Sequence, residues 1–144
     1  MKFTVVTALL SAFALPVFAV PAYVTWDPTY SNPYASLTTV SCSNGSNGLL
    51  TKGYTNFMSL PSFPNIGGVP GATWNSALCG SCWNLTYTAP SGNHNTISIT
   101  AVDSASTYNV SPNTFSALTN GTVSLETGKF AVEATQVAPI NCGM

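Results

Sequence analysis

Four cysteines constrain this chain more than any other feature of its sequence. They are Cys42, Cys79, Cys82 and Cys142. In a secreted chain, an even number of cysteines predicts a framework of disulfides. Two of the four form a C-G-S-C motif between two tryptophans. Such a motif serves as a redox dithiol, as part of a metal site, or as the meeting point of two structural bridges, and the surrounding residues must decide among these.

The residues around C-G-S-C favour structural bridges. A redox dithiol needs a helix that begins at the motif, because the helix N-terminus lowers the thiolate pKa. Here residues 84–88 read N-L-T-Y-T, an alternation typical of a strand. The one histidine, His94, lies outside zinc-ligand spacing, so we expect no metal and no cofactor. Four cysteines can pair in three ways. Two of these pairings close two long loops, and spacing alone does not choose between them.

The first residues indicate a signal peptide at 1–19. Lys2 precedes an apolar run that is too short to span a bilayer and contains Pro16. Small side chains at Val17 and Ala19 fit signal-peptidase cleavage after Ala19. We therefore expect residues 20–144 to form one secreted domain, without membrane insertion.

Charge is scarce in the predicted mature chain. It contains no arginine and has two lysines against four carboxylates, a formal charge of 2 − 4 = −2. Capture of nucleic acids or anionic membranes depends on positive charge. We therefore expect no nucleic-acid partner.

Sequence patterns predict a mainly β domain. Alternating β-formers predict strands at 36–42, 85–88, 96–102 and 129–137. Helix signals predict a short helix at 111–121 with Ser111 as its N-cap, and a weaker helix at 47–53. Residues 61–76 are too rich in proline and glycine for regular structure, yet apolar enough to pack onto the core. Short strands separated by turns are typical of a barrel or sandwich.

Six stretches together resemble the cerato-platanin family, small cysteine-bridged proteins secreted by filamentous fungi. They are VTWDPTY (24–30), VSCSNGSNGL (40–49), FPNIGGVPGATWNSALCGSCW (63–83), ITAVDS (99–104), YNVSPNTFSALTNG (108–121) and QVAPINCG (136–143). The resemblance covers essentially the whole chain from residue 20. It implies a six-stranded double-psi β-barrel with short helices, and disulfides that join Cys42 to Cys79 and Cys82 to Cys142.

The resemblance also implies a function. Members of this family bind chitin-type N-acetylglucosamine oligomers in a shallow groove and loosen cellulosic material as expansins do, without hydrolysis. They assemble at interfaces, and they act as elicitors and phytotoxins towards plants. By resemblance the groove involves Asp103, Asn109, Asp27 and Tyr30. The implied location is extracellular and in the fungal cell wall, and the implied partners are chitin and cellulose fragments, a plant-surface receptor and further copies of the chain.

Hydrolysis is the less favoured alternative, because it normally needs two carboxyl groups on either side of the scissile bond. Asp103 is the best acid candidate and Asp27 its one plausible partner, since Glu126 and Glu133 are expected to face solvent. We therefore expect no enzymatic activity. A surface-active, self-assembling wall protein without specific sugar binding is a further alternative.

Four N-glycosylation sequons follow the predicted signal peptide. Asn44, Asn84 and Asn120 are the candidate glycosylation sites. The fourth sequon begins at Asn109, which should stay unmodified if its side chain faces the groove.

Overall fold

The chain folds into a closed six-stranded barrel. The computed structural model describes residues 18–144, so the predicted signal peptide lies outside the described residues except for its last two. Around the barrel the strands follow the order β1-β5-β2-β4-β3-β6. They are β1 (Val20–Trp26), β2 (Ile66–Val69), β3 (Cys82–Thr88), β4 (His94–Ser104), β5 (Tyr108–Val110) and β6 (Lys129–Val137). The predicted mainly β barrel with short helices and two disulfides is confirmed.

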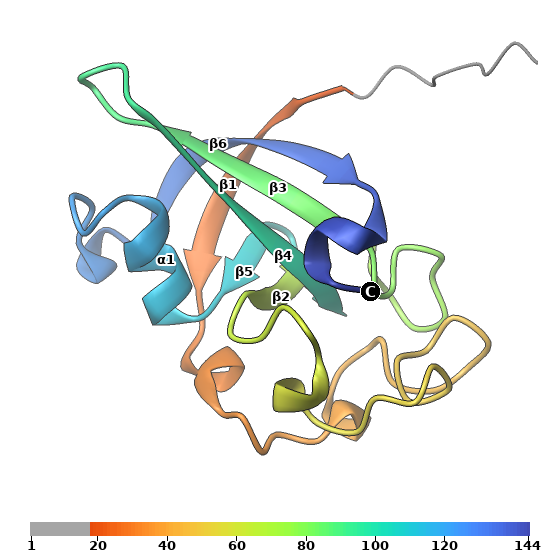
Figure 1. Ribbon diagram of the computed structural model, residues 1–144. Helices are drawn as coiled ribbons and strands as arrows, with labels where there is room; N and C mark the ends of the chain where they lie inside the picture. The colour runs from red at the N-terminus through yellow and green to blue at the C-terminus, as the bar shows by residue number, and fades with distance from the viewer. Residues whose placement is uncertain (1–17) are drawn as a thin grey trace, which may run out of the picture.

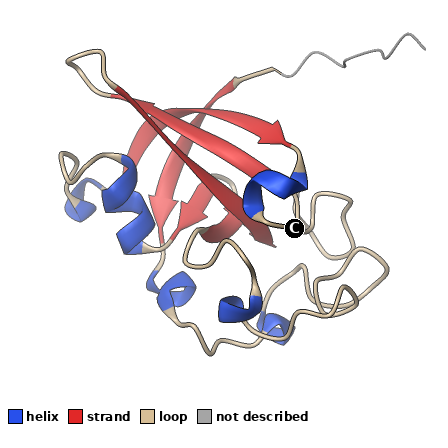
Figure 2. Cartoon of the chain, viewed as in Figure 1, coloured by secondary structure: helices blue, strands red, loops and turns tan. Residues whose placement is uncertain are grey.

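The helical segments are short and lie outside the barrel wall (Figures 1 and 2). There is one α-helix, α1 (Pro112–Leu118), among the described residues. The remaining helical segments are 3-10 turns: η1 (Pro28–Ser31), η2 (Leu37–Thr39), η3 (Phe57–Ser59), η4 (Leu125–Thr127) and η5 (Pro139–Cys142). Three of these turns belong to residues 28–65, a stretch that contains no barrel strand and that we call the loop region.

Strong alternation predicted the longer strands correctly. The predicted strand at 129–137 coincides with β6, in which Phe130, Val132 and Ala134 are buried and the residues between them are exposed. The predictions at 85–88 and 96–102 fall within β3 and β4. Alternate residues of β6 pack into the core, as a period-two pattern indicates, whereas four consecutive residues of β4, 99–102, are buried.

Helix α1 forms where its capping residues predicted it. The Ser111 hydroxyl accepts a hydrogen bond from the Thr114 backbone N–H, and a proline occupies the first turn. Phe115 is buried against Phe130 of β6, with ring centroids 4.7 Å apart. The helix ends at Leu118, and Gly121, at φ +73°, donates its N–H to the Ser116 carbonyl, so the chain turns away as predicted.

The predicted strand at 36–42 is wrong. The Ser36 hydroxyl accepts from the Thr38 backbone N–H and starts the 3-10 turn η2 instead. Leu37 and Val40 are buried three residues apart, a spacing that suits a turn and not a strand. Local side-chain capping thus overrode the β propensity of the threonines and valine.

The predicted helix at 47–53 is also wrong. This stretch consists of turns, and Gly53 has φ +98°, which interrupts a right-handed helix. The Leu49 backbone N–H donates to the Cys42 carbonyl, and the Tyr54 N–H donates to the Leu49 carbonyl. Contacts with neighbouring loop segments therefore replace the helical hydrogen-bond pattern.

Strands β1, β2 and β5 were not predicted from the sequence. Strand β2 lies inside the stretch 61–76, which was expected to lack regular structure. All four residues of β2 are buried, so the expectation that this stretch packs onto the core is confirmed. Strand β2 pairs in parallel with β4 and antiparallel with β5. An ideal Cβ at Gly67 would lie 2.2 Å from the Asn109 carbonyl oxygen, so glycine is what allows β5 to approach.

Two buried disulfides fasten the loops and the C-terminal turn to the barrel. They join Cys42 to Cys79 and Cys82 to Cys142, which confirms the pairing that the family resemblance implied. The sequence separations are 37 and 60 residues. Cys82 opens β3 and Cys142 ends η5, so the second bridge holds the last turn against the strand that starts at the motif.

Removing the longer bridge should destabilise the barrel strongly. We expect the paired substitution Cys82→Ala and Cys142→Ala to lower the free energy of unfolding by about 4 kcal/mol, because the unfolded chain regains the freedom of a long loop. Urea unfolding followed by tryptophan fluorescence measures this change. The pair Cys42→Ala and Cys79→Ala, which opens a shorter loop, is the matched comparison and should cost slightly less. An unchanged urea midpoint in either pair contradicts the prediction.

Candidate functional site

The Asp103 carboxylate, near the end of β4, accepts three hydrogen bonds. Its Oδ1 accepts hydrogen bonds from the backbone N–H groups of Ser41, at 3.0 Å, and Ser104, at 2.9 Å. Its Oδ2 accepts from the Tyr30 hydroxyl at 3.3 Å. These donors come from the loop region, from β4 and from η1. Asp103 is half-buried, so three segments fix the direction in which its remaining acceptor sites face.

Tyr30 is a buried neighbour of this carboxylate. Its side chain is 5% exposed, and its ring packs on Phe57 with centroids 6.1 Å apart. Burial raises the pKa of Tyr30 well above the ordinary value of 10.0, and the negative charges of Asp103 and Asp27 raise the pKa further. The phenol therefore stays neutral and acts as a hydrogen-bond donor to Asp103.

Gly68 of β2 separates Asp103 from Asn109. It pairs with Asp103 on its β4 side and with Asn109 on its β5 side. A Cβ at this position would lie 2.8 Å from the Ala105 Cβ and 3.1 Å from the Tyr30 hydroxyl oxygen. Gly68 is buried, and its lack of a side chain leaves the room that Ala105 and the Tyr30 hydroxyl occupy.

Asn109 is held from its other side by β1. The Thr25 hydroxyl donates to Asn109 Oδ1 at 3.0 Å, and Thr25 also exchanges a hydrogen bond of 2.6 Å with the Thr107 hydroxyl. Because Oδ1 is occupied, the Nδ2 donors of Asn109 are the part of the side chain left for a ligand. Among the described residues they make no hydrogen bond.

Asp27 serves mainly as a cap. It follows β1, and its Oδ1 accepts from the Thr29 backbone N–H at 2.8 Å, which starts the turn that carries Tyr30. Its backbone N–H donates to the Val110 carbonyl. The carboxylate is close enough to Tyr30 to raise the pKa of that phenol. Asp27 therefore supports the site by positioning Tyr30.

The structure brings three of the four predicted site residues together, and Asp27 lies at the start of the turn that carries Tyr30. Tyr30 and Asp103 are in direct contact, and Asn109 lies across Gly68 from Asp103. Sequence reasoning did not identify Gly68 or the backbone donor at Ser41, nor the hydroxyls of Thr25 and Thr107. The glycine pair of the I-G-G-V stretch was a usable signal, whereas the hydroxyls act only through strand pairing that local sequence does not reveal.

This arrangement suits hydrogen bonding to an uncharged ligand. It offers carboxylate acceptors, amide donors and hydroxyls in a line across β4, β2, β5 and β1. Within residues 18–144, no group of three or more histidine, cysteine, aspartate or glutamate side chains could hold a metal ion. The same residues contain no helix long and apolar enough to cross a membrane.

Three aromatic residues that could stack on a sugar differ in accessibility. Tyr108 is only 6% exposed and packs on Trp83, with centroids 5.4 Å apart. Trp26 is half-buried and donates its indole N–H to the Leu125 carbonyl. Tyr34, which follows η1, is 78% exposed. Tyr34 is therefore the one of these that presents an open face for stacking.

The three predicted glycosylation sites also differ in their surroundings. Asn44 is exposed and accepts from the Trp74 indole N–H at 2.6 Å, while Asn84 is half-buried on β3 and accepts from the Ser98 hydroxyl. Asn120 is exposed in a left-handed turn at φ +52°. Glycosylation at these positions stays a prediction, and Asn44 and Asn120 are the two exposed positions.

Comparisons with known proteins agree on one family. The family model described as Cerato-platanin matches residues 22–144. The chain is 37% identical over 145 residues to the protein named "Cerato-platanin" from Ceratocystis fimbriata f. sp. platani, which covers 99% of this chain and 96% of that protein. It is 37% identical over 155 residues to "Allergen Asp f 15" from Aspergillus fumigatus, covering 99% and 97% respectively. The crystal structure of cerato-platanin 1 from M. perniciosa matches with a TM-score of 0.78 at 36% identity, over 84% of this chain and 98% of that one.

The buried Tyr30 phenol should make stability fall at alkaline pH. Above about pH 10 the unfolded chain loses the tyrosine proton that the folded chain retains, so the free energy of unfolding declines as pH rises. We expect Tyr30→Phe to cost about 0.5–1.5 kcal/mol at neutral pH and to flatten this alkaline decline. Urea unfolding at several pH values measures both effects. Equal slopes for Tyr30→Phe and the unsubstituted chain contradict the assignment.

Proposed function

Since the chain belongs to the cerato-platanin family, whose members are secreted fungal proteins, we propose that it is a secreted, non-catalytic binder of chitin-type N-acetylglucosamine oligomers. The observation that carries this proposal is the Asp103 carboxylate, oriented by three hydrogen bonds, with Asn109 across Gly68 from it. The proposed location is the extracellular space and the fungal cell wall.

The chemistry of the N-acetyl group fits the two sides of the groove. An acetamido group carries one N–H donor and one carbonyl acceptor. Asp103 offers acceptor sites, and Asn109 offers its Nδ2 donors across Gly68. One acetamido group, or the acetamido and hydroxyl groups of neighbouring sugar units, can therefore satisfy both side chains. Thr25 and Thr107 add hydroxyls at the β1 side.

Affinity in such a groove should be modest. The described residues here contain few positive charges, so binding depends on hydrogen bonds and stacking rather than on long-range attraction. A shallow surface removes little of the ligand from water. Dissociation constants on the order of micromolar to millimolar are expected for sites of this kind.

Wall loosening and plant responses follow from the same surface in this proposal. A protein that offers hydrogen bonds to single polysaccharide chains competes with the bonds between those chains, so cellulose fragments are a second ligand. Contact with plant walls then places the protein where a plant-surface receptor can detect it as an elicitor or phytotoxin. These outcomes rest on the family resemblance rather than on a particular contact.

The carboxylates do not form a glycosidase pair in this proposal. Retaining or inverting hydrolysis needs two carboxyl groups in defined positions around the bond. Asp103 is held by two backbone N–H groups and a phenol, and Asp27 is engaged in capping η1. Glu126 and Glu133 are exposed on η4 and β6. Expansin-like loosening without hydrolysis is therefore the activity we favour.

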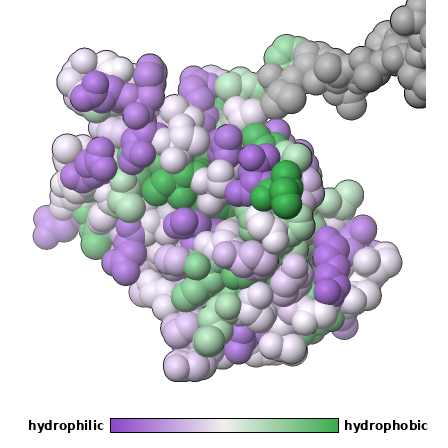
Figure 3. Space-filling model, in the orientation of Figure 1, coloured by the Kyte–Doolittle hydropathy of each residue, from purple (hydrophilic) through white to green (hydrophobic). Residues whose placement is uncertain are grey.

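A surface-active wall protein is the second candidate. Tyr34 is 78% exposed and Met58 is 54% exposed, and the Met58 backbone N–H donates to Pro33, so the two side chains project from adjoining turns. Self-association through such residues is the alternative to sugar binding. Figure 3 shows apolar residues in small, separated patches on the visible face, which favours the sugar-binding proposal.

Asp103→Asn should weaken oligomer binding without unfolding the protein. The amide keeps an Oδ1 that accepts from Ser41 and Ser104, while the charge is lost. We expect roughly tenfold weaker binding of the N-acetylglucosamine tetramer, about 1.4 kcal/mol, in a titration followed by residue-resolved NMR. Glu126→Gln removes the same charge from an exposed turn and should bind as the unsubstituted chain does. If Asp103→Asn and Asn109→Ala both bind normally while folded, the groove is misplaced.

The protein should release no reducing ends from chitin, cellulose or β-glucan. It should nevertheless loosen filter paper, because loosening requires binding and not bond cleavage. Reducing-sugar assays on a pure preparation test this expectation. Sugar release that disappears in the Asp103→Asn and Asp27→Asn variants would overturn it.

A further inference from the structure

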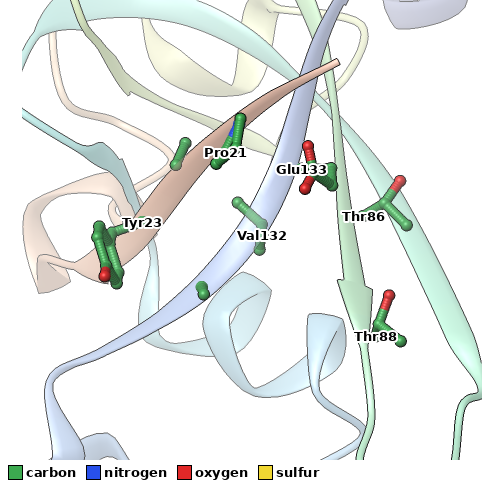
Figure 4. A pocket seen from close by; sticks show the side chains of 8 residues that line it. Pro21, Tyr23, Thr86, Thr88, Val132 and Glu133 are labelled. Carbon is green, nitrogen blue, oxygen red and sulfur yellow. The ribbon is translucent and has the colours of Figure 1, made fainter.

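A hollow on the outer face of the barrel shares strand β1 with the Asp103 groove, because Tyr23 in the hollow is two residues from Thr25. Its volume is about 300 Å³, and it opens over the strands β1, β6 and β3 (Figure 4). Tyr23, Glu133 and Thr88 are exposed on this face, and Thr86 is half-buried. The side chains that the argument uses are Pro21, Tyr23, Thr86, Thr88 and Glu133. We call this site the outer hollow.

Strand register sets the spacing inside the outer hollow. Glu133 lies opposite Pro21 of β1 on one side and opposite Thr86 of β3 on the other. Tyr23 pairs with Ala131, so Tyr23 and Glu133 are diagonal neighbours across β1 and β6. Diagonal neighbours on one face lie roughly 7–8 Å apart, which a single sugar ring can bridge.

The Glu133 carboxylate lacks a partner among the described residues. It forms no hydrogen bond and no ion pair within residues 18–144, which distinguishes it from Asp103 with its three donors. The nearby cation, Lys129, instead places its Nζ over the Tyr23 ring, 5.1 Å from the centroid. The outer hollow therefore has a positive charge at one end and an unpaired negative charge at the other.

The remaining side chains offer a sugar an apolar surface and oriented hydroxyls. Tyr23 is 52% exposed and Pro21 is exposed beside it, so the C–H face of a pyranose can stack there. The Thr86 hydroxyl is 2.7 Å from that of Thr96, and the Thr88 hydroxyl is 2.8 Å from His94 Nδ1. Neighbours on β4 thus hold both hydroxyls in place.

We propose that the outer hollow binds a protonated amino sugar, a pyranose ring with a free ammonium group, such as a glucosamine unit of deacetylated chitin. The ammonium pairs with Glu133 in a charge-assisted hydrogen bond, the ring stacks on Tyr23, and ring hydroxyls bond to Thr86 and Thr88. Lys129 lies over Tyr23 and repels the ammonium from that end of the outer hollow. The sugar ring therefore binds with its ammonium towards Glu133. This site does not depend on the Asp103 groove.

The test compares two tetramers that differ only in acetylation. The chain from residue 20 is titrated with the glucosamine tetramer and, separately, with the N-acetylglucosamine tetramer, both followed by residue-resolved NMR. The glucosamine tetramer should shift amides at 21–23, 86–88 and 131–133. Higher salt should weaken this binding, because the pair at Glu133 is exposed to screening ions.

Single substitutions locate the interaction. Glu133→Gln should weaken glucosamine binding about two- to fivefold, as expected for an exposed ion pair. Tyr23→Ala should weaken it by a similar factor, about two- to fivefold, since the stacking face is lost. Neither substitution should change binding of the acetylated tetramer in the Asp103 groove, and Asp103→Asn should leave the glucosamine shifts at 131–133 in place.

Glu126→Gln is the matched control, because it removes one negative charge from an exposed turn outside the outer hollow. Glucosamine binding should be unchanged in this variant. Equal weakening in Glu126→Gln and Glu133→Gln would mean general attraction to a negatively charged protein and would overturn the proposal. Glucosamine shifts confined to the surroundings of Asp103 would overturn it as well. If the acetylated tetramer fails to bind while the glucosamine tetramer binds at the outer hollow, the proposal for the Asp103 groove is contradicted and the proposal for the outer hollow is supported.

Discussion

The close approach of β5 to β2 is the constraint on which the rest of the barrel depends. Strand β5 has only three residues, yet it joins β1 to β2 and so closes the sheet. A side chain at Gly67 would collide with the Asn109 carbonyl, so the contact exists only because this position is glycine. The same contact sets Asn109 beside Gly68 and Asp103. Barrel closure and the placement of Asn109 across Gly68 from Asp103 therefore rest on one strip of backbone.

The Cys42–Cys79 disulfide lies next to a donor of the Asp103 carboxylate. Ser41 donates to Asp103, and the next residue, Cys42, bonds to Cys79 and donates its backbone N–H to the Val102 carbonyl. The disulfide thus holds one donor of the Asp103 carboxylate against β4. Because the loop region has little regular structure to stabilise it, this bridge and its neighbouring hydrogen bonds take over the role that strand pairing has in the barrel.

Asp103 and Glu133 show how surroundings give the same kind of group different uses. The chain already supplies three donors to Asp103, which leaves a directional acceptor suited to neutral amides and hydroxyls. Glu133 projects from β6 beside an aromatic ring and makes no hydrogen bond within the described residues. The two proposed carbohydrate sites therefore differ in the charge that they select.

The sequence by itself determined the features that depend on near neighbours. The alternation of β6, the Ser111 cap and Pro112 start of α1, and the even cysteine count all act locally or covalently, and the structure contains each as predicted. The disulfide pairing and the four groove residues came from family resemblance. Only the tertiary structure decided that 36–42 turns, that 66–69 is a strand, and that Thr25 and Gly68 lie beside Asn109. These features rest on hydrogen bonds and close approaches between segments far apart in the chain, which local pattern does not encode.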